Sequence, residues 1–312
     1  MSIIPHIVAV GTAVPGHDIH AAFIAWARAR LPEARSARVF DRMAGRAAIN
    51  HRWSVLPVSD DGGSPVDPGG FYARDILPGT AERMKLYAAA APALALEAIA
   101  ALGEKVALGG ITHLVVASCT GFVAPGIDQI IAARLGLSPT VERLLVGFMG
   151  CYAAVAALRS ARHIVRSDPA ARVLVVCVEL STLHLQDTPA LDTDQGFAMH
   201  LSGEVPARIA AGLADPVFAT AATGGRDPQE IDGWAVHAGG RSILDAVETA
   251  LSLPHDALAT SRGVLADVGN MSSATLMFVL ARLLDGPRIE NGVALAFGPG
   301  LAAEGFGFRS AG

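Results

Sequence analysis

Three side chains with complementary chemistry stand where apolar segments give way to glycine-rich bends: Cys151, His237 and Asn270. A cysteine at the N-terminus of a helix has its thiolate stabilised by unpaired backbone N–H groups and by the helix dipole. A nearby imidazole can hold that thiolate as an ion pair or take the thiol proton. An uncharged amide can join the imidazole in binding an oxyanion, the large electrostatic contribution in acyl chemistry. Together these residue types suggest nucleophilic acyl transfer.

Each of the three residues also has a purely structural interpretation. Cys151 can be a small buried hydrophobe, as single cysteines often are. His237 can be a hydrogen-bonded residue at a strand end, and Asn270 can be a helix N-cap, a position that asparagine favours. The functional interpretation depends on their occurring together in one repeated register.

That register is an internal repeat with a constant offset of 119 residues. The matching pairs are Ser118 and His237, Gly121 and Gly240, Cys151 and Asn270, and Val173 and Gly292. A duplicated strand–helix unit predicts two similar α/β halves packed about a pseudo-twofold axis, with boundaries at 1–190 and 191–312. Equivalent points of the halves meet at such an axis, so the cysteine, histidine and asparagine are expected to converge there.

The coarse pattern of elements supports an α/β protein with mostly parallel sheets. Expected strands cover residues 7–10, 112–118, 142–148, 171–180, 231–237 and 291–300, and expected helices cover residues 21–30, 126–137, 150–167 and 241–253. Residues 262–284 are interpreted as a bend followed by a helix. Residues 60–70 are rich in turn formers and predict a surface loop.

Composition limits the class of protein. The 312 residues are 52% apolar and 17% charged, which suits a large core, and the net charge of -5 argues against a general nucleic-acid binder. Three cysteines without paired spacing form neither a disulfide framework nor a metal site. The N-terminus lacks the positive region of a signal peptide, and the apolar run at 86–102 is interrupted by Pro92 and Glu97. A cytoplasmic protein without a membrane span is therefore expected.

Several segments resemble the signatures of type III polyketide synthases, the chalcone synthase superfamily: GFMGCYAAVAALRSA, WAVHAGGRSILDAV, GNMSSAT and FGPGLAAEG. ASCTGFVAPGID and ERMKLYAAAAPALA resemble its bacterial members, including alkylresorcinol and alkylpyrone synthases. The resemblance extends from the N-terminus to about Arg309. It implies a homodimer with the thiolase-like fold, in which two duplicated halves form a five-layered αβαβα arrangement.

The resemblance also implies roles for the three candidate residues. Cys151 would take an acyl group from coenzyme A as a thioester. His237 would activate it and then assist Asn270 in the decarboxylation of malonyl-CoA, whose carbanion extends the chain by two carbons. The substrates, acyl-CoA and malonyl-CoA, are free thioesters, so no cofactor beyond coenzyme A itself is expected.

Further residues are assigned by the same resemblance to binding. Arg52 falls where the family keeps a basic residue near the coenzyme A phosphates, although an exposed arginine is also a common surface charge. Cys119 and Thr120 would line the elongation pocket, although both also suit packing after a strand.

Two departures from the family pattern stand out. Leu185 and Met199 occupy positions where the family carries gatekeeper residues, and these flexible aliphatic side chains suggest an aliphatic starter. A long segment containing a GDGA strand is missing near Asp192, so an unpaired sheet edge and exposed apolar surface are expected. The absence of this segment has three possible explanations: a true deletion with a compensating dimer contact, a degenerate enzyme, or a sequence from which residues are missing.

Three other functions compete with this interpretation. A ketoacyl synthase III-like enzyme would use an acyl carrier protein with the same three residues, but GFMGCYAA fits it less well. A catalytically silent thiolase-fold subunit, acting as a binding or dimer partner, is suggested by the missing segment. A cysteine hydrolase is disfavoured, since such enzymes orient histidine differently.

Overall fold

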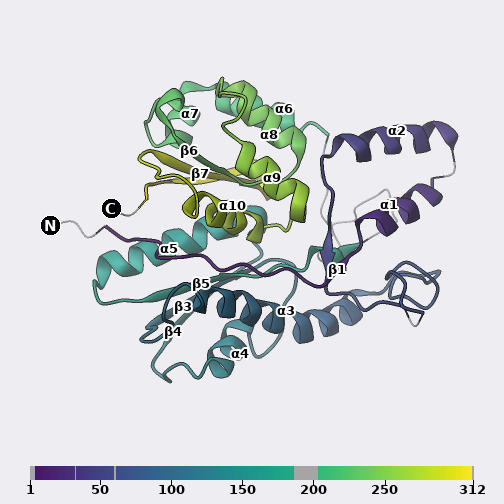
Figure 1. Cartoon of the computed structure of the whole chain (residues 1–312), viewed down its shortest axis with the longest axis horizontal. Coiled ribbons are helices and arrows are strands. Elements are labelled where there is room, and N and C mark those ends of the chain that lie inside the picture. Colours follow the sequence, from purple (N-terminus) through teal and green to yellow (C-terminus); the bar gives the residue numbers. More distant parts are fainter. Residues whose placement is uncertain (1–3, 32, 60, 186–202, 311–312) are drawn as a thin grey trace.

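The computed structural model describes residues 4–31, 33–59, 61–185 and 203–310, and these residues form two stacked α/β halves. Figure 1 shows the halves one above the other, each with its own sheet, and helices α5 and α10 between the sheets. Helices α3 and α4 cover the lower sheet, and α6 and α8 cover the upper one. The order of layers is therefore helix, sheet, helix, sheet, helix.

The sheet of the first half contains three parallel strands in the order β4 (Glu142–Gly147), β3 (His113–Ser118) and β5 (Val173–Cys177). The connecting helices are α4 (Ile127–Arg134) and α5 (Ala153–Ser167), and α3 (Thr80–Gly103) precedes the sheet. Residues Leu114 to Ala117 of β3 are fully buried because helices cover both faces.

The sheet of the second half pairs β6 (Gly233–Val236) with β7 (Gly292–Gly298) in parallel, and β7 with β8 (Ala302–Phe308) in antiparallel orientation. Its helices are α6 (Val205–Ala214), α7 (Pro216–Thr223), α8 (Arg241–Ala250), α9 (Ala259–Val268) and α10 (Ala274–Leu284). The predicted boundary between residues 190 and 191 lies outside the described residues and stays a prediction.

A smaller N-terminal region extends to one side of the two halves (Figure 1). It contains α1 (His20–Ala29), α2 (Ala34–Arg46) and an antiparallel pair formed by β1 (His17–Asp18) and β2 (Trp53–Ser54). Single 3-10 turns occur at Gly150–Tyr152, Ser181–His184, Pro228–Glu230 and Pro299–Leu301.

The repeat is visible in the backbone as well as in the sequence. Strands β5 and β7 begin at the equivalent residues Val173 and Gly292, and helices α5 and α10 occupy equivalent places. Gly150 and Gly269, which precede Cys151 and Asn270, have φ angles of 73° and 72°. The middle helices share one apolar cluster, which includes Ala154, Val155, Leu276, Val279 and Leu280.

Three expectations differ from the structure. Residues 7–10 are extended but form no strand, because no described segment bonds to their backbone. Residues 259–268, interpreted in part as a bend, form helix α9 because Val264, Leu265 and Val268 pack against the core. Strand β8 was not predicted, since the glycines of AAEGFGF weaken a strand pattern.

Helix α3 is the one described helix that is long and apolar enough to cross a membrane. Here it packs against β5 and α4, and Tyr87, Ala91, Ala95 and Ile99 are buried. Length and composition alone do not separate such a core helix from a membrane span.

Candidate active site

Cys151 lies in the tight turn that joins β4 to α5. Gly150 before it has a φ of 73°, a conformation that side chains rarely adopt, and a Cβ at this position would lie 2.5 Å from Cδ of Pro299. Gly150 is therefore required on two grounds, backbone conformation and close contact with the second half. At Gly147, by contrast, a Cβ would meet only Ser118 O, at an ordinary contact distance of 3.9 Å.

The thiol of Cys151 is half-buried and receives a hydrogen bond from Ser272 Oγ at 3.7 Å. Burial raises the pKa of Cys151 above its ordinary value, and the Ser272 hydrogen bond opposes that rise. The negative charge of Glu179 adds to the rise. Burial of the Cys151 thiol therefore opposes the stabilisation of a thiolate that is expected at a helix N-terminus.

Asn270 follows Gly269 in the loop between α9 and α10. Its Nδ2 donates to Gly239 O at 3.0 Å, and its Oδ1 accepts from Ser272 N at 2.9 Å. Ser272, which has a φ of 51°, thus contacts Cys151 through its hydroxyl and Asn270 through its backbone. This serine connects the cysteine of the first half to the asparagine of the second.

His237 follows β6 and is fixed by its backbone. Its N–H donates to Leu295 O at 2.8 Å, and its carbonyl accepts from Gly239 N at 2.9 Å. The side chain is buried, and within the described part of the chain neither ring nitrogen has a hydrogen-bond partner. Burial alone lowers the pKa of His237 to about 4, so the ring is neutral at pH 7.

This neutral burial predicts acid instability. The folded-state pKa of about 4 lies below the ordinary 6.5, so the unfolded chain binds the extra proton first as the pH falls. The free energy of unfolding contributed by His237 should fall by roughly 3 kcal/mol between pH 6.5 and pH 4. The free energy of unfolding of His237→Phe, measured with urea, should change by roughly 3 kcal/mol less than that of the wild type between these two pH values. His255→Gln is the matched control, because the His255 side chain is fully exposed, and it should follow the wild type.

Glu179 is a buried carboxylate that the sequence reasoning missed as a functional residue. Its oxygens accept hydrogen bonds from the backbone N–H groups of Cys119 and Thr120, at 3.0 to 3.1 Å, and from the hydroxyls of Thr120 and Ser273, at 2.8 and 2.5 Å. Burial raises its pKa to about 6, although these donors oppose the rise. A single carboxylate within the apolar segment 171–180, which was expected to be a strand, was the available signal.

Glu179 predicts a pH effect of opposite sign. Its folded-state pKa of about 6 exceeds the ordinary 4.5, so the folded chain holds the proton more tightly and loses stability as the pH rises through this range. Relative to Glu179→Gln, the wild type should lose roughly 2 kcal/mol of unfolding free energy between pH 4.5 and pH 7. Urea unfolding of both proteins at the two pH values measures the difference, and a constant difference would contradict the prediction.

Cys119 and Thr120 hold this network together. The thiol of Cys119 accepts from Gly150 N at 3.0 Å, directly before Cys151, and burial raises the pKa of Cys119 to about 12. Thr120 Oγ1 donates to Glu179 and accepts from Leu180 N at 2.8 Å. The structure thus places Cys119 beside Glu179 and Gly150 and Thr120 beside Glu179, and neither residue lines the neighbouring cavity described next.

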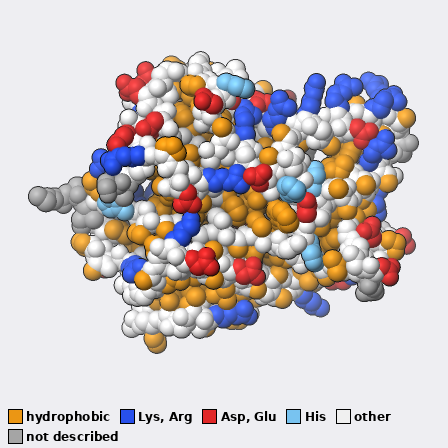
Figure 2. All heavy atoms as spheres, viewed as in Figure 1, with side chains coloured by type: hydrophobic (Ala, Val, Ile, Leu, Met, Phe, Trp, Pro, Cys, Tyr) orange, Lys and Arg blue, Asp and Glu red, His pale blue; other side chains and the backbone are white. Residues whose placement is uncertain are grey.

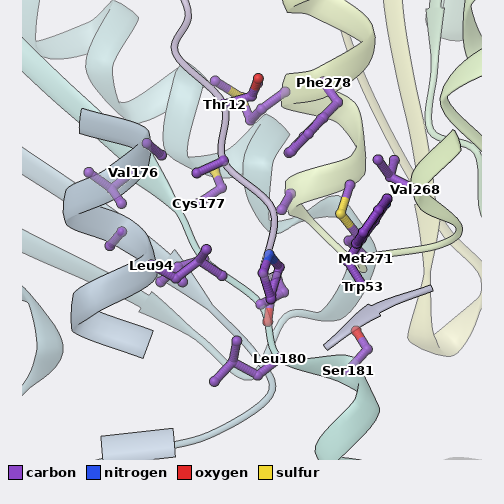
Figure 3. Close-up of a pocket in the computed structure, with 18 of the residues that line it drawn as sticks. Thr12, Trp53, Leu94, Val176, Cys177, Leu180, Ser181, Val268, Met271 and Phe278 are labelled. Carbon is purple, nitrogen blue, oxygen red and sulfur yellow. The ribbon is translucent and has the colours of Figure 1, made fainter. Parts of the chain in front are cut away.

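A cavity of about 360 Å³ lies between α3, β5 and α10. Figure 3 shows its lining, with Cys177, Met271, Trp53 and Phe278 directed toward the open space. The lining also contains Leu185, Asn270, Glu179 and Arg52. The predicted gatekeeper Leu185 and the candidate catalytic amide therefore border one largely apolar cavity.

Arg52 stands at the edge of this cavity and is half-buried rather than a solvated surface charge. Its guanidinium contacts His20 Nδ1, and its backbone N–H donates to Asp18 Oδ1 at 3.0 Å. Burial lowers the pKa of Arg52, and the charge of Asp18 opposes the shift. The second gatekeeper position, Met199, lies outside the described residues.

Among the described residues there is no group of three or more histidine, cysteine, aspartate or glutamate side chains that could hold a metal ion. The side chains described at the site offer a thiol, an imidazole, an amide and a buried carboxylate. This set suits acyl transfer through a thioester.

Comparison with known proteins identifies the sequence family. Residues 4–212 match the N-terminal domain of the chalcone and stilbene synthases, and residues 187–312 match the C-terminal domain. The chain is 33% identical to an alpha-pyrone synthesis polyketide synthase-like protein, Pks18 of Mycobacterium tuberculosis, over 287 aligned positions. These cover 73% of this chain and 72% of the relative. Because 73% of 312 residues is well short of 287 positions, the alignment opens a gap in this chain, in keeping with a missing segment.

Two solved structures share the fold. One is PKS-I from the brown alga Ectocarpus siliculosus, 26% identical, with a TM-score of 0.79 and coverage of 97% of both chains. The other is CsyB complexed with CoA-SH, 21% identical, with a TM-score of 0.81 and coverage of 98% of this chain and 99% of that one. At 21% identity, the similarity to CsyB shows only that the two chains share a fold. The predicted thiolase-like fold is confirmed.

Proposed function

Because this chain belongs to the chalcone and stilbene synthase family, the type III polyketide synthases, we propose that Cys151 carries an acyl starter that malonyl-CoA extends. The family makes the chain an acyltransferase that performs polyketide condensation. The observation that supports the assignment of residues is Ser272, which links the Cys151 thiol to Asn270 across the two halves.

Loading begins with the Cys151 thiol and an acyl-CoA thioester. His237 is neutral and accepts the thiol proton, while the sulfur attacks the carbonyl carbon. Ser272 Oγ donates to the sulfur and stabilises the developing thiolate. The carbon–sulfur bond to coenzyme A breaks, the proton passes to the departing thiolate, and the acyl group remains on Cys151.

Extension uses the same histidine and asparagine on malonyl-CoA. Loss of carbon dioxide leaves the electron pair on the thioester enolate, and N–H donors of Asn270 and His237 hold its oxygen. The enolate carbon attacks the Cys151 thioester and lengthens the acyl chain by two carbons. The thiolate of Cys151 is released and can be loaded again.

The cavity supports an aliphatic starter. Its walls include the flexible or branched apolar side chains of Leu185, Val268, Met271 and Met277. Asn270 lines the same cavity. Cys151 does not itself line this cavity, so an acyl chain held on Cys151 would enter it past Asn270, which Ser272 links to Cys151. Aromatic starters that load much faster than fatty acyl-CoAs of similar size would contradict this choice.

Arg52 and the arginines of α2 support binding of the coenzyme A phosphates. Helix α2 carries Arg35, Arg38, Arg42 and Arg46, and Figure 2 shows Lys and Arg side chains gathered over it. Arg52 follows this helix and borders the cavity. The fold neighbour CsyB was crystallised with CoA-SH, which is consistent with a coenzyme A thioester as substrate.

The remaining assignments complete the proposal. The enzyme acts as a homodimer in the cytoplasm, requires no cofactor beyond its coenzyme A substrates, and divides near residue 190 into its cysteine-bearing and histidine-bearing halves. The family match favours this function over a ketoacyl synthase III-like enzyme and over a silent subunit.

Intact-protein mass spectrometry tests the function directly. The protein is incubated with a panel of acyl-CoAs and then with malonyl-CoA, without any carrier protein. An adduct that maps to Cys151 and disappears as a polyketide is released is the expected result. Extension only in the presence of an acyl carrier protein would indicate the ketoacyl synthase III-like alternative, and no adduct from folded protein would indicate the silent subunit.

A further inference from the structure

Strand β5 is an edge strand, although its counterpart in the other half is not. Within the described residues, the backbone of β5 bonds to β3 on one side and to no segment on the other. Its repeat equivalent β7 is central, because β8 pairs with its second side in antiparallel orientation. With the offset of 119, β8 corresponds to residues 183–189, of which only 183–185 are described, and the 3-10 turn Ser181–His184 matches the turn Pro299–Leu301 that leads into β8.

The N-terminal segment at residues 4–10 forms a second open edge. Its side chains alternate between exposed and more buried positions, from Ile4 at 55% and Val8 at 78% exposure to the buried Val10. This alternation is typical of a strand. No backbone hydrogen bond joins this segment to another described residue.

Two cavities lie between these two open edges. Their volumes are about 360 and 1020 Å³, and they share lining residues from both sides: Ala9, Val10, Leu102, Leu174, Val175 and Met277. Helix α3 borders the first cavity on one side, and α10 borders it on the other. Figure 1 shows the N-terminal segment running beside β5 at the level of the lower sheet. We call this joined space the sheet-edge trough.

We propose that the sheet-edge trough binds an extended peptide strand from a partner, antiparallel to β5. Unpaired strand edges bind added strands through backbone hydrogen bonds, and here two edges face one space. The antiparallel direction follows from β8, which fills the equivalent place beside β7. Helices cover both faces, so the bound strand should carry small apolar residues on both of its sides.

Charge indicates the rest of the partner's chemistry. One end of the trough is lined by Arg159, Arg162, Arg166, Arg172, Arg226 and Arg309. Arg159 pairs with Glu304, whereas Arg162 and Arg166 are exposed. This end adjoins the first residues of β5, where an antiparallel strand finishes. The partner strand should therefore end in acidic residues at its C-terminal side.

A synthetic peptide, GTVAVAVDE, is the probe. Fluorescence anisotropy of the labelled peptide should show saturable binding, and at a hundredfold excess over Kd the Tm of the protein should rise by about 5 °C. The peptide GTVPVPVDE lacks two backbone donors and should not bind. Equal binding of both peptides, or no binding of either, would overturn the proposal. Peptide-independent self-association that excludes the probe would assign the trough to a second copy instead.

Matched variants test the two walls separately. Alternate N–H groups of an extended segment point to opposite sides, so only one of Ile7→Pro and Val8→Pro should weaken binding at least tenfold. The other variant serves as the control for folding. Arg162→Glu with Arg166→Glu should also weaken binding tenfold at low salt and less at high salt, whereas Arg35→Glu on α2 should not. Since only binding and Tm are measured, failure here leaves the catalytic proposal unaffected.

Discussion

Replacing Cys151 with alanine should abolish acyl-enzyme formation and lower the rate of polyketide formation by on the order of 10⁴-fold. The thiol is the group to which the starter becomes attached, and neither His237 nor Asn270 can form the thioester in its place. The fold should survive, because alanine fits the turn and Gly150 keeps the required φ of 73°. Intact mass after incubation with an acyl-CoA measures the effect.

The other two cysteines provide the controls for this experiment. Cys177 lines the cavity and Cys119 contacts Gly150, so both lie close enough to be acylated by accident. Cys177→Ala should keep the adduct at full occupancy, because this half-buried thiol lies on β5 and burial raises its pKa. Acylation that persists in Cys151→Ala and disappears in Cys177→Ala would reverse the assignment.

Replacing Asn270 with alanine should separate the two half-reactions. The amide is proposed to hold the enolate oxygen of malonyl-CoA, and loss of one such donor costs about 10²- to 10³-fold in rate. Starter loading needs the thiol and the imidazole, so it should stay within about tenfold of the wild type. Carbon dioxide release from malonyl-CoA and the occupancy of the Cys151 thioester measure the two steps separately.

The control for this variant is Asn50→Ala. Asn50 is exposed, and its described hydrogen bond is made by its backbone N–H to Ala266 O. It should change neither step. Equal loss of loading and decarboxylation in Asn270→Ala would instead indicate that the residue only orders the loop through Gly239 and Ser272.

Much of the fold could be predicted because the sequence contains an internal repeat of one α/β unit. The offset of 119 residues made β3 equivalent to β6 and β5 equivalent to β7. The glycines that precede Cys151 and Asn270 both adopt positive φ angles in the structure. The family and the thiolase-like fold are confirmed. The roles of Cys151, His237 and Asn270 stay predictions, since their chemistry requires a substrate.

What escaped prediction depends on contacts distant in sequence. Glu179 accepts hydrogen bonds from donors in two loops, whereas the sequence pattern shows only a lone acidic residue within an apolar segment. Residues 302–308 form strand β8 because they pair with the edge of β7, although the glycines in β8 disfavour a strand. Residues 7–10 have a strand pattern but lack a described partner, so the pattern alone predicted too much.

The turn at Cys151 has a consequence for refolding. Pro299 packs on Gly150, and Ser272 reaches Cys151, so residues from the second half complete the surroundings of a thiol that belongs to the first. A chain whose first half has folded before the second docks would hold a cysteine without its hydroxyl donor. The moment at which the thiol becomes acylatable during refolding should therefore report the docking of the two halves, later than any signal from helix formation.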